Sequence, residues 1–228
     1  MGEPETRGCH LRLVTFYADC VLPIKSKEKQ EGFDWHHAMR MLSASAEKSL
    51  GVETLVATDS RTSIPAALRV GDAKRDGLML WLLDAQAACM EVFAGDLLLV
   101  SPDTLINGPV PMFGDWDLCL LTRAKPKPIV NSVIAVRSGP AVSKLWARIA
   151  REARGLSEES KAWGADIDAV VNALQIKPLE SGIRTVDGVR VRFLPINGVF
   201  ETVNGRRPSV PIWDFKGKRK KIMHQYFP

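Results

Sequence analysis

The stretch GDLLLVSPDTLI, residues 95–106, decides the fold of this chain. Four consecutive apolar residues end abruptly at Ser101-Pro102-Asp103, after which apolar residues resume. A short apolar run bounded by turn residues is typical of a strand buried in a sheet. In open α/β sheets, ligands bind beyond the carboxyl ends of such strands. The stretch therefore predicts an α/β fold in which a strand carries Asp103 to a ligand site.

The composition is that of an ordinary globular protein, since 46% of the 228 residues are apolar and 25% are charged. We expect one compact α/β domain over residues 1–228, with residues 1–10 as an N-terminal extension and residues 215–228 as a basic tail. The sequence has no uninterrupted apolar window of about 18 residues, and its start, MGEPETRGCH, lacks a basic segment followed by an apolar run. We therefore expect no membrane span, no signal peptide and a cytoplasmic location.

The positive charge is concentrated near the end of the chain. The net charge is +5, and KGKRKK, residues 216–221, places five basic residues in six positions. Such a cluster attracts the phosphates of a nucleotide, a nucleic-acid backbone or an anionic membrane, or else it is a solvated terminus. The four cysteines are scattered without a CxxC pair, which favours buried or incidental thiols over a zinc site or a disulfide framework.

Apolar periodicity predicts strands and helices that alternate along the chain. The expected strands cover residues 11–18, 52–60, 96–100, 116–123, 130–138 and 188–196, with a short strand in 212–221, and the expected helices cover 35–50, 76–93, 140–156 and 166–175. This alternation predicts a mixed, mainly parallel, Rossmann-like sheet with helices on both faces. It does not indicate an oligomeric state.

Several segments in this order resemble the GT-A class of nucleotide-sugar glycosyltransferases. LLLVSPDTLI resembles the strand that ends in the DxD metal motif, and DWDLCLLTR and NSVIAVRSG resemble the two segments after it. WGADIDAVVNAL resembles the helix start "G-x-D-Q-x-x-x-N", while VRFLPINGVF and IWDFKGKRK resemble the late "LP-x-x-x-N" and "H-F-x-G-x-x-K" elements. Together these likenesses span residues 11–221, and the last one leans towards the retaining galactosyltransferase and glycogenin group.

The resemblance implies a divalent cation, Mn²⁺ or Mg²⁺, next to the donor diphosphate. Asp103 occupies the second acidic position of the metal motif, whereas Ser101 replaces the first and Asp214 replaces the terminal histidine. Hard cations prefer oxygen ligands and keep phosphate oxygens in their shell, so Asp103 and Asp214 would suffice if the tail folds back, with Ser101 as a weak or water-mediated neighbour. Lys220, at the lysine position of the family, and Lys218 suit the leaving diphosphate.

Three further residues are candidates for donor or acceptor contacts. The resemblance places Asp166 on the carboxylate that faces the sugar or the acceptor, and its alternative is a helix N-cap. Thr15 and Asp59 lie near the ends of the first two predicted strands, where they would contact the nucleoside. For Asp59, a carboxylate that caps the following turn is an equal alternative.

The predicted function is transfer of a sugar from a nucleotide-diphosphate sugar, most simply a UDP-sugar, to a hydroxyl group. A basic protein suits an anionic acceptor, such as a hydroxymethylated base in DNA. The alternatives are a saccharide or lipid-linked acceptor, or a binding protein that kept the fold and lost catalysis, as Ser101 suggests. A nucleotidyltransferase is disfavoured because LVTFYADCVLPIKSK, residues 13–27, contains no glycine-rich loop.

Overall fold

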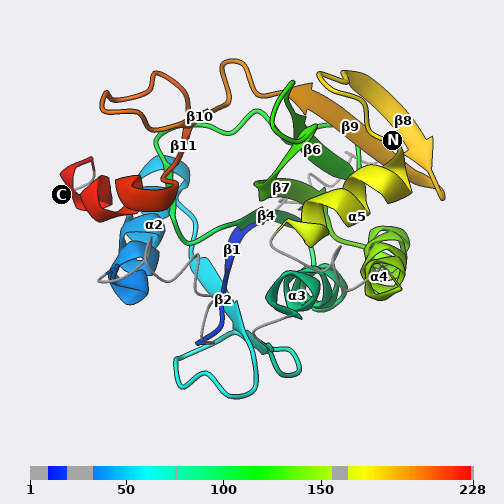
Figure 1. The fold of residues 1–228 in the computed structure, drawn as a ribbon, viewed down its shortest axis with the longest axis horizontal. Helices are drawn as coiled ribbons and strands as arrows, with labels where there is room; N and C mark the ends of the chain where they lie inside the picture. Colours follow the sequence, from blue (N-terminus) through cyan, green and yellow to red (C-terminus); the bar gives the residue numbers. More distant parts are fainter. Residues whose placement is uncertain (1–9, 20–32, 75–76, 156–163, 227–228) are drawn as a thin grey trace, which may run out of the picture.

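The computed structural model describes residues 10–19, 33–74, 77–155 and 164–226, and Figure 1 shows its ribbon. The predicted N-terminal extension, apart from His10, lies outside the described residues, as do Cys9 and Cys20. Cys89 and Cys119 are described, and both are free and buried, as expected. Burial raises the pKa of each thiol to about 12. No helix in the described part of the chain combines the length and the apolar character that a bilayer crossing needs.

An eight-stranded sheet forms the centre of the protein. Its order is β3 (Leu68–Arg69), β2 (Thr54–Thr58), β1 (Leu11–Tyr17), β4 (Asp96–Val100), β7 (Ile129–Arg137), β6 (Leu118–Thr122), β9 (Val189–Pro195) and β8 (Gly182–Val186). Four of the pairings are parallel, while β7 runs antiparallel to both β4 and β6, and β8 to β9. The predicted fold class, a mixed and mainly parallel sheet, is confirmed.

A second sheet of three strands packs beside the first. It contains β10 (Phe200–Thr202), β11 (Ile212–Asp214) and β5 (Thr104–Ile106), with β11 in the middle. The apolar residues after Asp103 are β5, so the chain leaves the central sheet after β4 and enters the small sheet at once. Asp103 therefore lies at the junction of the two sheets. The predicted strands did not include β5, β10, which lies in a turn-rich segment, or the edge strands β3 and β8.

Helices cover both faces of the central sheet, as predicted (Figure 1). One face carries α3 (Leu78–Val92), α4 (Pro140–Arg154) and α5 (Ala165–Leu174), while α2 (Trp35–Leu50) and the small sheet cover the other. Residues alternate along the strands, so Leu97 and Leu99 face the first layer and Leu98 and Val100 the second. Every residue of β4 is buried, which explains its continuous apolar run.

The basic C-terminal segment is folded. After β11 the chain turns at Gly217, whose φ is +58°, and forms a 3-10 helix, η3 (Gly217–Gln225). Phe215 and Met223 are fully buried in an apolar cluster with residues of α2 and the small sheet. The ring of Tyr226 packs against Phe215 with the centroids 5.4 Å apart. The alternative of a solvated terminus is wrong for Lys220, which is buried, whereas the other four basic residues of 216–221 are exposed.

Candidate functional site

The polar residues predicted from the sequence gather at one edge of the central sheet. Because β1, β2, β4, β6 and β9 run in the same direction, their carboxyl ends share this side, which we call the carboxyl edge. Asp103 lies three residues after the end of β4, and Asp59 directly follows β2. Thr15 lies inside β1, two residues before its end. The fold therefore brings candidates from distant parts of the sequence to the side where α/β sheets bind ligands.

Asp103 and Lys220 form a buried ion pair. The ammonium of Lys220 lies 2.7 Å from Oδ2 of Asp103, and each residue is 8% exposed. The same ammonium lies 4.2 Å from the ring centroid of Trp35, at the start of α2, a cation–π distance. The backbone carbonyl of Asp103 accepts a hydrogen bond of 2.9 Å from the backbone N–H of Phe215. The C-terminal segment thus folds back onto Asp103.

Asp214 is a fully buried carboxylate close to a second negative charge. Its Oδ2 lies 3.4 Å from Nζ of Lys216 and from Oγ1 of Thr202, while its Oδ1 has no hydrogen-bond partner. Burial, and after it the charge of Asp103, raises the pKa of Asp214 to about 6. Thr202 and Thr104 are the cross-strand neighbours of Asp214, and Oγ1 of Thr104 also lacks a partner. The small sheet therefore presents a row of polar groups with unused bonding capacity.

Asp103 and Asp214 are the carboxylates that a Mn²⁺ or Mg²⁺ ion would use, although an ammonium already pairs with each of them. Such ions need one or two carboxylates and take further oxygens from phosphates and water, and the unpartnered Oδ1 of Asp214 suits that role. Within the described ranges, no group of three or more His, Cys, Asp or Glu side chains could hold a metal ion. Ser101 is half-buried, and its backbone N–H donates to the carbonyl of Ser132 at 2.9 Å. A metal ion bound by Asp103 would also lie beside the ammonium of Lys220, which already pairs with this carboxylate.

A second buried polar pair joins β7 to α5. The pairing of β6 with β7 shifts its register between Leu120 and Leu121, a bulge that leaves Asn131 unpaired with β6. Nδ2 of Asn131 donates a hydrogen bond of 2.6 Å to Oδ2 of Asp166. The Oδ1 atoms of both residues are buried without partners. Burial raises the pKa of Asp166, and the hydrogen bond from Asn131 opposes that shift.

The N-cap alternative for Asp166 is wrong. Gly164, in the left-handed conformation with φ of +97°, is the N-cap of α5, and Asp166 is the second residue of the helix. Its side chain bonds to Asn131 across the fold. Sequence reasoning did not single out Asn131, although a polar residue inside the buried run 129–136 was a usable signal.

Thr15, Asp59 and Lys218 have different surroundings. Thr15 is fully buried, and its Oγ1 has no partner. Asp59 is buried, and its two oxygens accept the backbone N–H groups of Thr62 at 3.0 Å and Ala73 at 3.2 Å. Asp59 therefore binds backbone N–H groups of the loop after β2, which agrees with the alternative that it caps the following turn. Lys218 is exposed on η3.

Partnerless polar atoms concentrate at the carboxyl edge. Among the described residues, buried side-chain oxygens without a partner occur at this edge on Thr15, Thr104, Asn131, Ser132, Asp166 and Asp214; elsewhere, Oγ1 of Thr54 and Nε of Arg184 also lack a partner. An unsatisfied buried polar group costs about 1 to 3 kcal/mol, so such a concentration needs a physical account. Oxygens of this kind can accept hydrogen bonds from buried water or from a ligand that carries hydroxyl groups.

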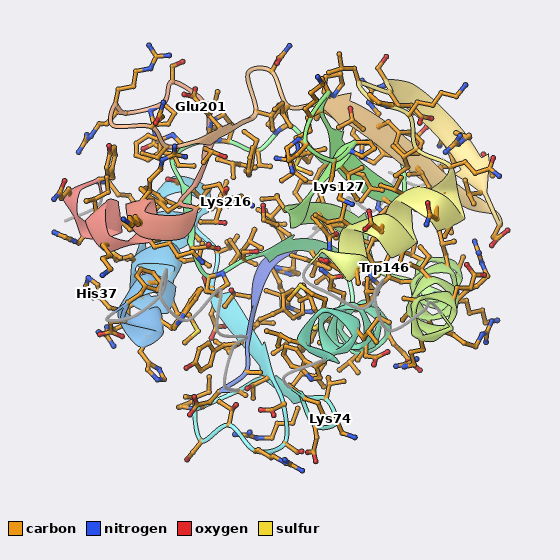
Figure 2. All side chains as sticks on the ribbon, viewed as in Figure 1. His37, Lys74, Lys127, Trp146, Glu201 and Lys216 are labelled. Atoms are coloured by element: carbon orange, nitrogen blue, oxygen red, sulfur yellow. The ribbon has the colours of Figure 1, made fainter. Side chains whose placement is uncertain are left out.

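Positive charges flank the same edge. Lys127, on the loop between β6 and β7, forms an ion pair with Asp168 of α5. In the view of Figure 2, Lys127 lies beside α5 and Lys216 near the C-terminal segment, with β4 and β7 between them. Arg123 is half-buried, and burial lowers the pKa of its guanidinium, while the charge of Asp214 partly opposes that shift. Fixed cations of this kind stabilise the negative charge of a diphosphate.

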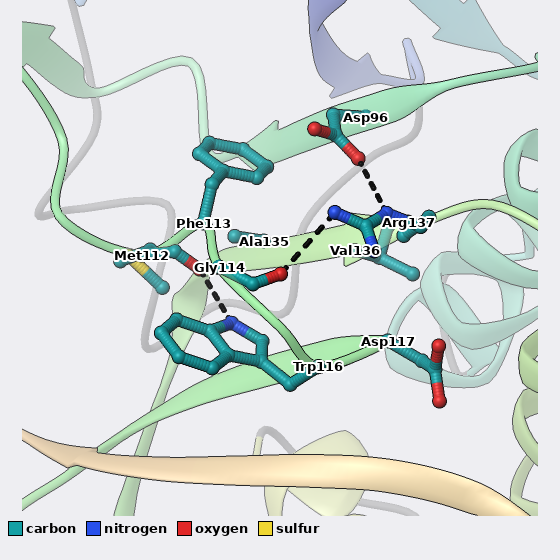
Figure 3. Close-up of a pocket in the computed structure, with 9 residues that line it drawn as sticks. All are labelled: Asp96, Met112, Phe113, Gly114, Trp116, Asp117, Ala135, Val136 and Arg137. Atoms are coloured by element: carbon teal, nitrogen blue, oxygen red, sulfur yellow. Dashed lines mark hydrogen bonds and ion pairs between the residues drawn. The ribbon is translucent and has the colours of Figure 1, made fainter. Parts of the chain in front are cut away.

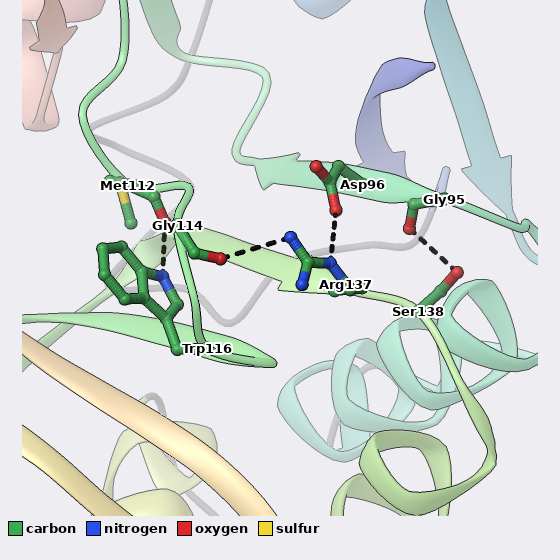
Figure 4. A network of polar contacts seen from close by, with 7 residues as sticks. All are labelled: Gly95, Asp96, Met112, Gly114, Trp116, Arg137 and Ser138. Carbon is green, nitrogen blue, oxygen red and sulfur yellow. Dashed lines mark hydrogen bonds and ion pairs between the residues drawn. The ribbon is translucent and has the colours of Figure 1, made fainter. Parts of the chain in front are cut away.

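A pocket at the opposite edge has satisfied polar groups. It lies where β4 and β6 begin and β7 ends (Figure 3). Arg137 contacts Oδ1 of Asp96 at 3.3 Å and donates to the carbonyl of Gly114 at 3.2 Å, while Nε1 of Trp116 donates to the carbonyl of Met112 at 2.9 Å (Figure 4). These contacts tie the 112–116 loop to the sheet. We therefore assign this edge a structural role.

Comparison with known proteins reveals a shared fold. No family model matches the sequence, and no curated protein matches it. The structure is similar to the crystal structure of a glycosyltransferase involved in the glycosylation of the major capsid of PBCV-1, with a TM-score of 0.57 and 9% sequence identity. The likeness covers 94% of this chain and 98% of that chain. At this identity, the comparison shows a common architecture over nearly the whole length of both chains.

Proposed function

We propose that this chain transfers a sugar from a nucleotide-diphosphate sugar, with a UDP-sugar as the expected donor, to a hydroxyl acceptor. The observation that carries the proposal is the concentration of buried, partnerless oxygens at the carboxyl edge, beside two carboxylates and several cations. A sugar nucleotide has the matching chemistry, because its sugar offers hydroxyl donors and its diphosphate offers negative charge. The architecture shared with a glycosyltransferase supports the same activity.

In this proposal the Asn131–Asp166 pair binds the sugar, and the lysine of the Asp103–Lys220 pair binds the diphosphate. Oδ1 of Asn131 and Oδ1 of Asp166, both buried and without partners, accept hydrogen bonds from the hydroxyl groups of the sugar. Lys216, Lys218 and Lys220 face the diphosphate. Thr15 and Asp59 are the proposed nucleoside contacts.

The chemistry of transfer then follows from charge. The bond between the anomeric carbon and the phosphate oxygen breaks, and the cations stabilise the negative charge that develops on the leaving diphosphate. The acceptor oxygen forms the new bond, and its proton passes to a leaving phosphate oxygen. Mn²⁺ or Mg²⁺, when bound by Asp103 and Asp214, would add positive charge at the diphosphate.

For the acceptor, we favour a hydroxymethylated base in DNA. Exposed cations on η3, namely Lys218, Arg219 and Lys221, lie next to the proposed donor site and suit a phosphate backbone. A saccharide or a lipid-linked acceptor is the alternative. Sugar transfer to hydroxymethylated DNA, plain DNA and lipid fractions, measured side by side, separates these acceptors. Transfer to DNA that survives neutralisation of all three cations would show that these cations do not bind the acceptor, whereas no transfer to hydroxymethylated DNA would remove DNA as the acceptor.

The proposed activity is tested by the release of UDP from a panel of UDP-sugars, with Mn²⁺ and with EDTA. We expect Asp166→Asn to slow UDP release by about 10- to 100-fold, the effect of losing a hydrogen bond to a charged group, with UDP affinity unchanged. Asp187→Asn is the matched control, because this exposed carboxylate lies on the turn between β8 and β9 and pairs with Arg148. UDP binding without release from any UDP-sugar would indicate the non-catalytic binding protein. Equal effects of the two substitutions would remove Asp166 from the site.

A further inference from the structure

We propose that the ammonium of Lys220 is the resident cation of Asp103, so that the chain binds a nucleoside diphosphate without a divalent metal ion. The proposal rests on the proposed function, because it assigns the cation requirement of the same site. Its geometric basis is the ion pair of 2.7 Å between Nζ of Lys220 and Oδ2 of Asp103. Lys220 thereby supplies positive charge at the carboxylate that a metal ion would need.

The surroundings of the pair hold the ammonium in place. The side chains of Lys220 and Asp103 are 9% and 12% exposed, so little solvent screens their attraction. The face of Trp35, 4.2 Å away, contributes a further attraction for a cation, and the ring of Phe33 lies 5.8 Å away. A metal ion that took Asp103 would leave this ammonium without its counter-ion in a largely desolvated position. Breaking a buried pair in this way is strongly unfavourable.

The backbone that carries Lys220 is also fixed before any ligand binds. Met223, one helical turn further along η3, is fully buried, and Phe215 before the helix is buried in the same cluster. The backbone N–H of Phe215 is bonded to the carbonyl of Asp103 itself. A charge held in this way needs no reorganisation when a diphosphate arrives, which is the condition for effective electrostatic stabilisation.

The charges around Asp103 and Asp214 also favour an ammonium over a divalent metal ion. The two carboxylates, Asp103 and Asp214, are each matched by an ammonium, Lys220 and Lys216 respectively. Ser101 contributes no charge at the first position of the motif. A divalent cation binds best where carboxylate charge is uncompensated, whereas an ammonium has three donors and Asp103 takes one. A phosphate oxygen can accept another.

The test is UDP binding to the full chain, measured by calorimetry in EDTA and in Mn²⁺. We expect the wild-type dissociation constants in the two conditions to agree within about 3-fold, less than the effect of one lost charged hydrogen bond. In EDTA, Lys220→Met should weaken UDP binding by about 10- to 100-fold, the effect of losing a hydrogen bond to a charged group. Lys144→Met removes the same charge from an exposed position on α4 and should leave binding within about 2-fold.

The possible results test the role of Lys220 and the proposed function separately. Wild-type UDP binding that needs Mn²⁺ overturns the role of Lys220 and leaves the proposed function standing. Failure of UDP to bind both with and without Mn²⁺ overturns the proposed function. Lys220→Arg, which keeps the charge, should retain metal-free binding, and its loss of binding with the fold intact would count against the proposal. If Lys220→Met does not fold, the wild-type comparison and Lys220→Arg still give a decision.

Discussion

The two polar edges of the central sheet use the same residue types in opposite ways. At the edge where β4 begins, Asp96 contacts Arg137, and Asp117 accepts the backbone N–H of Arg190 at 2.8 Å. At the carboxyl edge, Asp214 and Asp166 each keep one buried oxygen without a partner. Paired groups stabilise the fold, whereas unpaired ones reduce its stability and persist where something else selects for them. These carboxylates therefore differ in how far the fold satisfies their oxygens.

Asp59 shows that the distinction applies to residues rather than to whole edges. It lies at the carboxyl edge, yet both of its oxygens accept buried backbone N–H groups. Asp59→Ala should therefore lower the free energy of unfolding by about 2 to 4 kcal/mol, because two buried donors lose their partner. Urea unfolding measures this effect, and Asp19→Ala, at an exposed position close by, is the control.

The same variant tests the proposed nucleoside contact. If Asp59 is purely structural, folded Asp59→Ala binds UDP with wild-type affinity. A large loss of UDP affinity with little loss of stability would instead show that Asp59 binds the nucleoside. A carboxylate that is satisfied in the fold would then also be functional, contrary to the comparison above.

Much of the fold was predictable because burial leaves a local pattern. The apolar run before Ser101 predicted β4, and α2 covers the predicted residues 35–50 and is followed by Gly51, whose φ is +67°. The edge strand β8 escaped prediction because its residues alternate between exposed and half-buried positions. The 3-10 helix η3 was not predicted, because the lysines between Phe215 and Met223 leave no regular apolar pattern.

The candidate site was only partly predictable, because its contacts join distant segments. Asp103 and Asp214 were named from the resemblance, and the structure places them close enough for their charges to interact. The pairing of Asn131 with Asp166 depends on a bulge, and the contact of Lys220 with Trp35 depends on the packing of η3. Neither leaves a signal at a fixed spacing in the sequence.

Asp214→Asn should stabilise the protein in a pH-dependent manner. The folded-state pKa of Asp214 is raised to about 6, from an ordinary value near 4, so the folded state favours the neutral form. The stability that the wild-type residue contributes is present below about pH 4 and is lost as the pH rises through about 6. The variant, which is always neutral, should gain about 1 to 3 kcal/mol over wild type at pH 7.5 and much less at pH 4.

Urea unfolding of Asp214→Asn and wild type at both pH values measures this difference. Asp117→Asn, at the opposite edge, should show no such gain at pH 7.5, because the carboxylate of Asp117 is satisfied in the fold. A loss of stability in Asp214→Asn at pH 7.5 would mean that its pair with Lys216 outweighs the cost of burial. Asp214 would then belong with the satisfied carboxylates.

Arg137→Met should have the smallest effect and should be confined to stability. It removes the contacts of the guanidinium with Asp96 and with the carbonyl of Gly114. The side chain of Arg137 is 45% exposed and that of Asp96 is 10% exposed, so the loss of this partly screened pair should cost about 1 to 2 kcal/mol. UDP affinity and UDP release should not change in the folded variant. A clear fall in either one, with most of the stability retained, would show that the two edges are coupled and that satisfied polar groups do not by themselves mark a structural region.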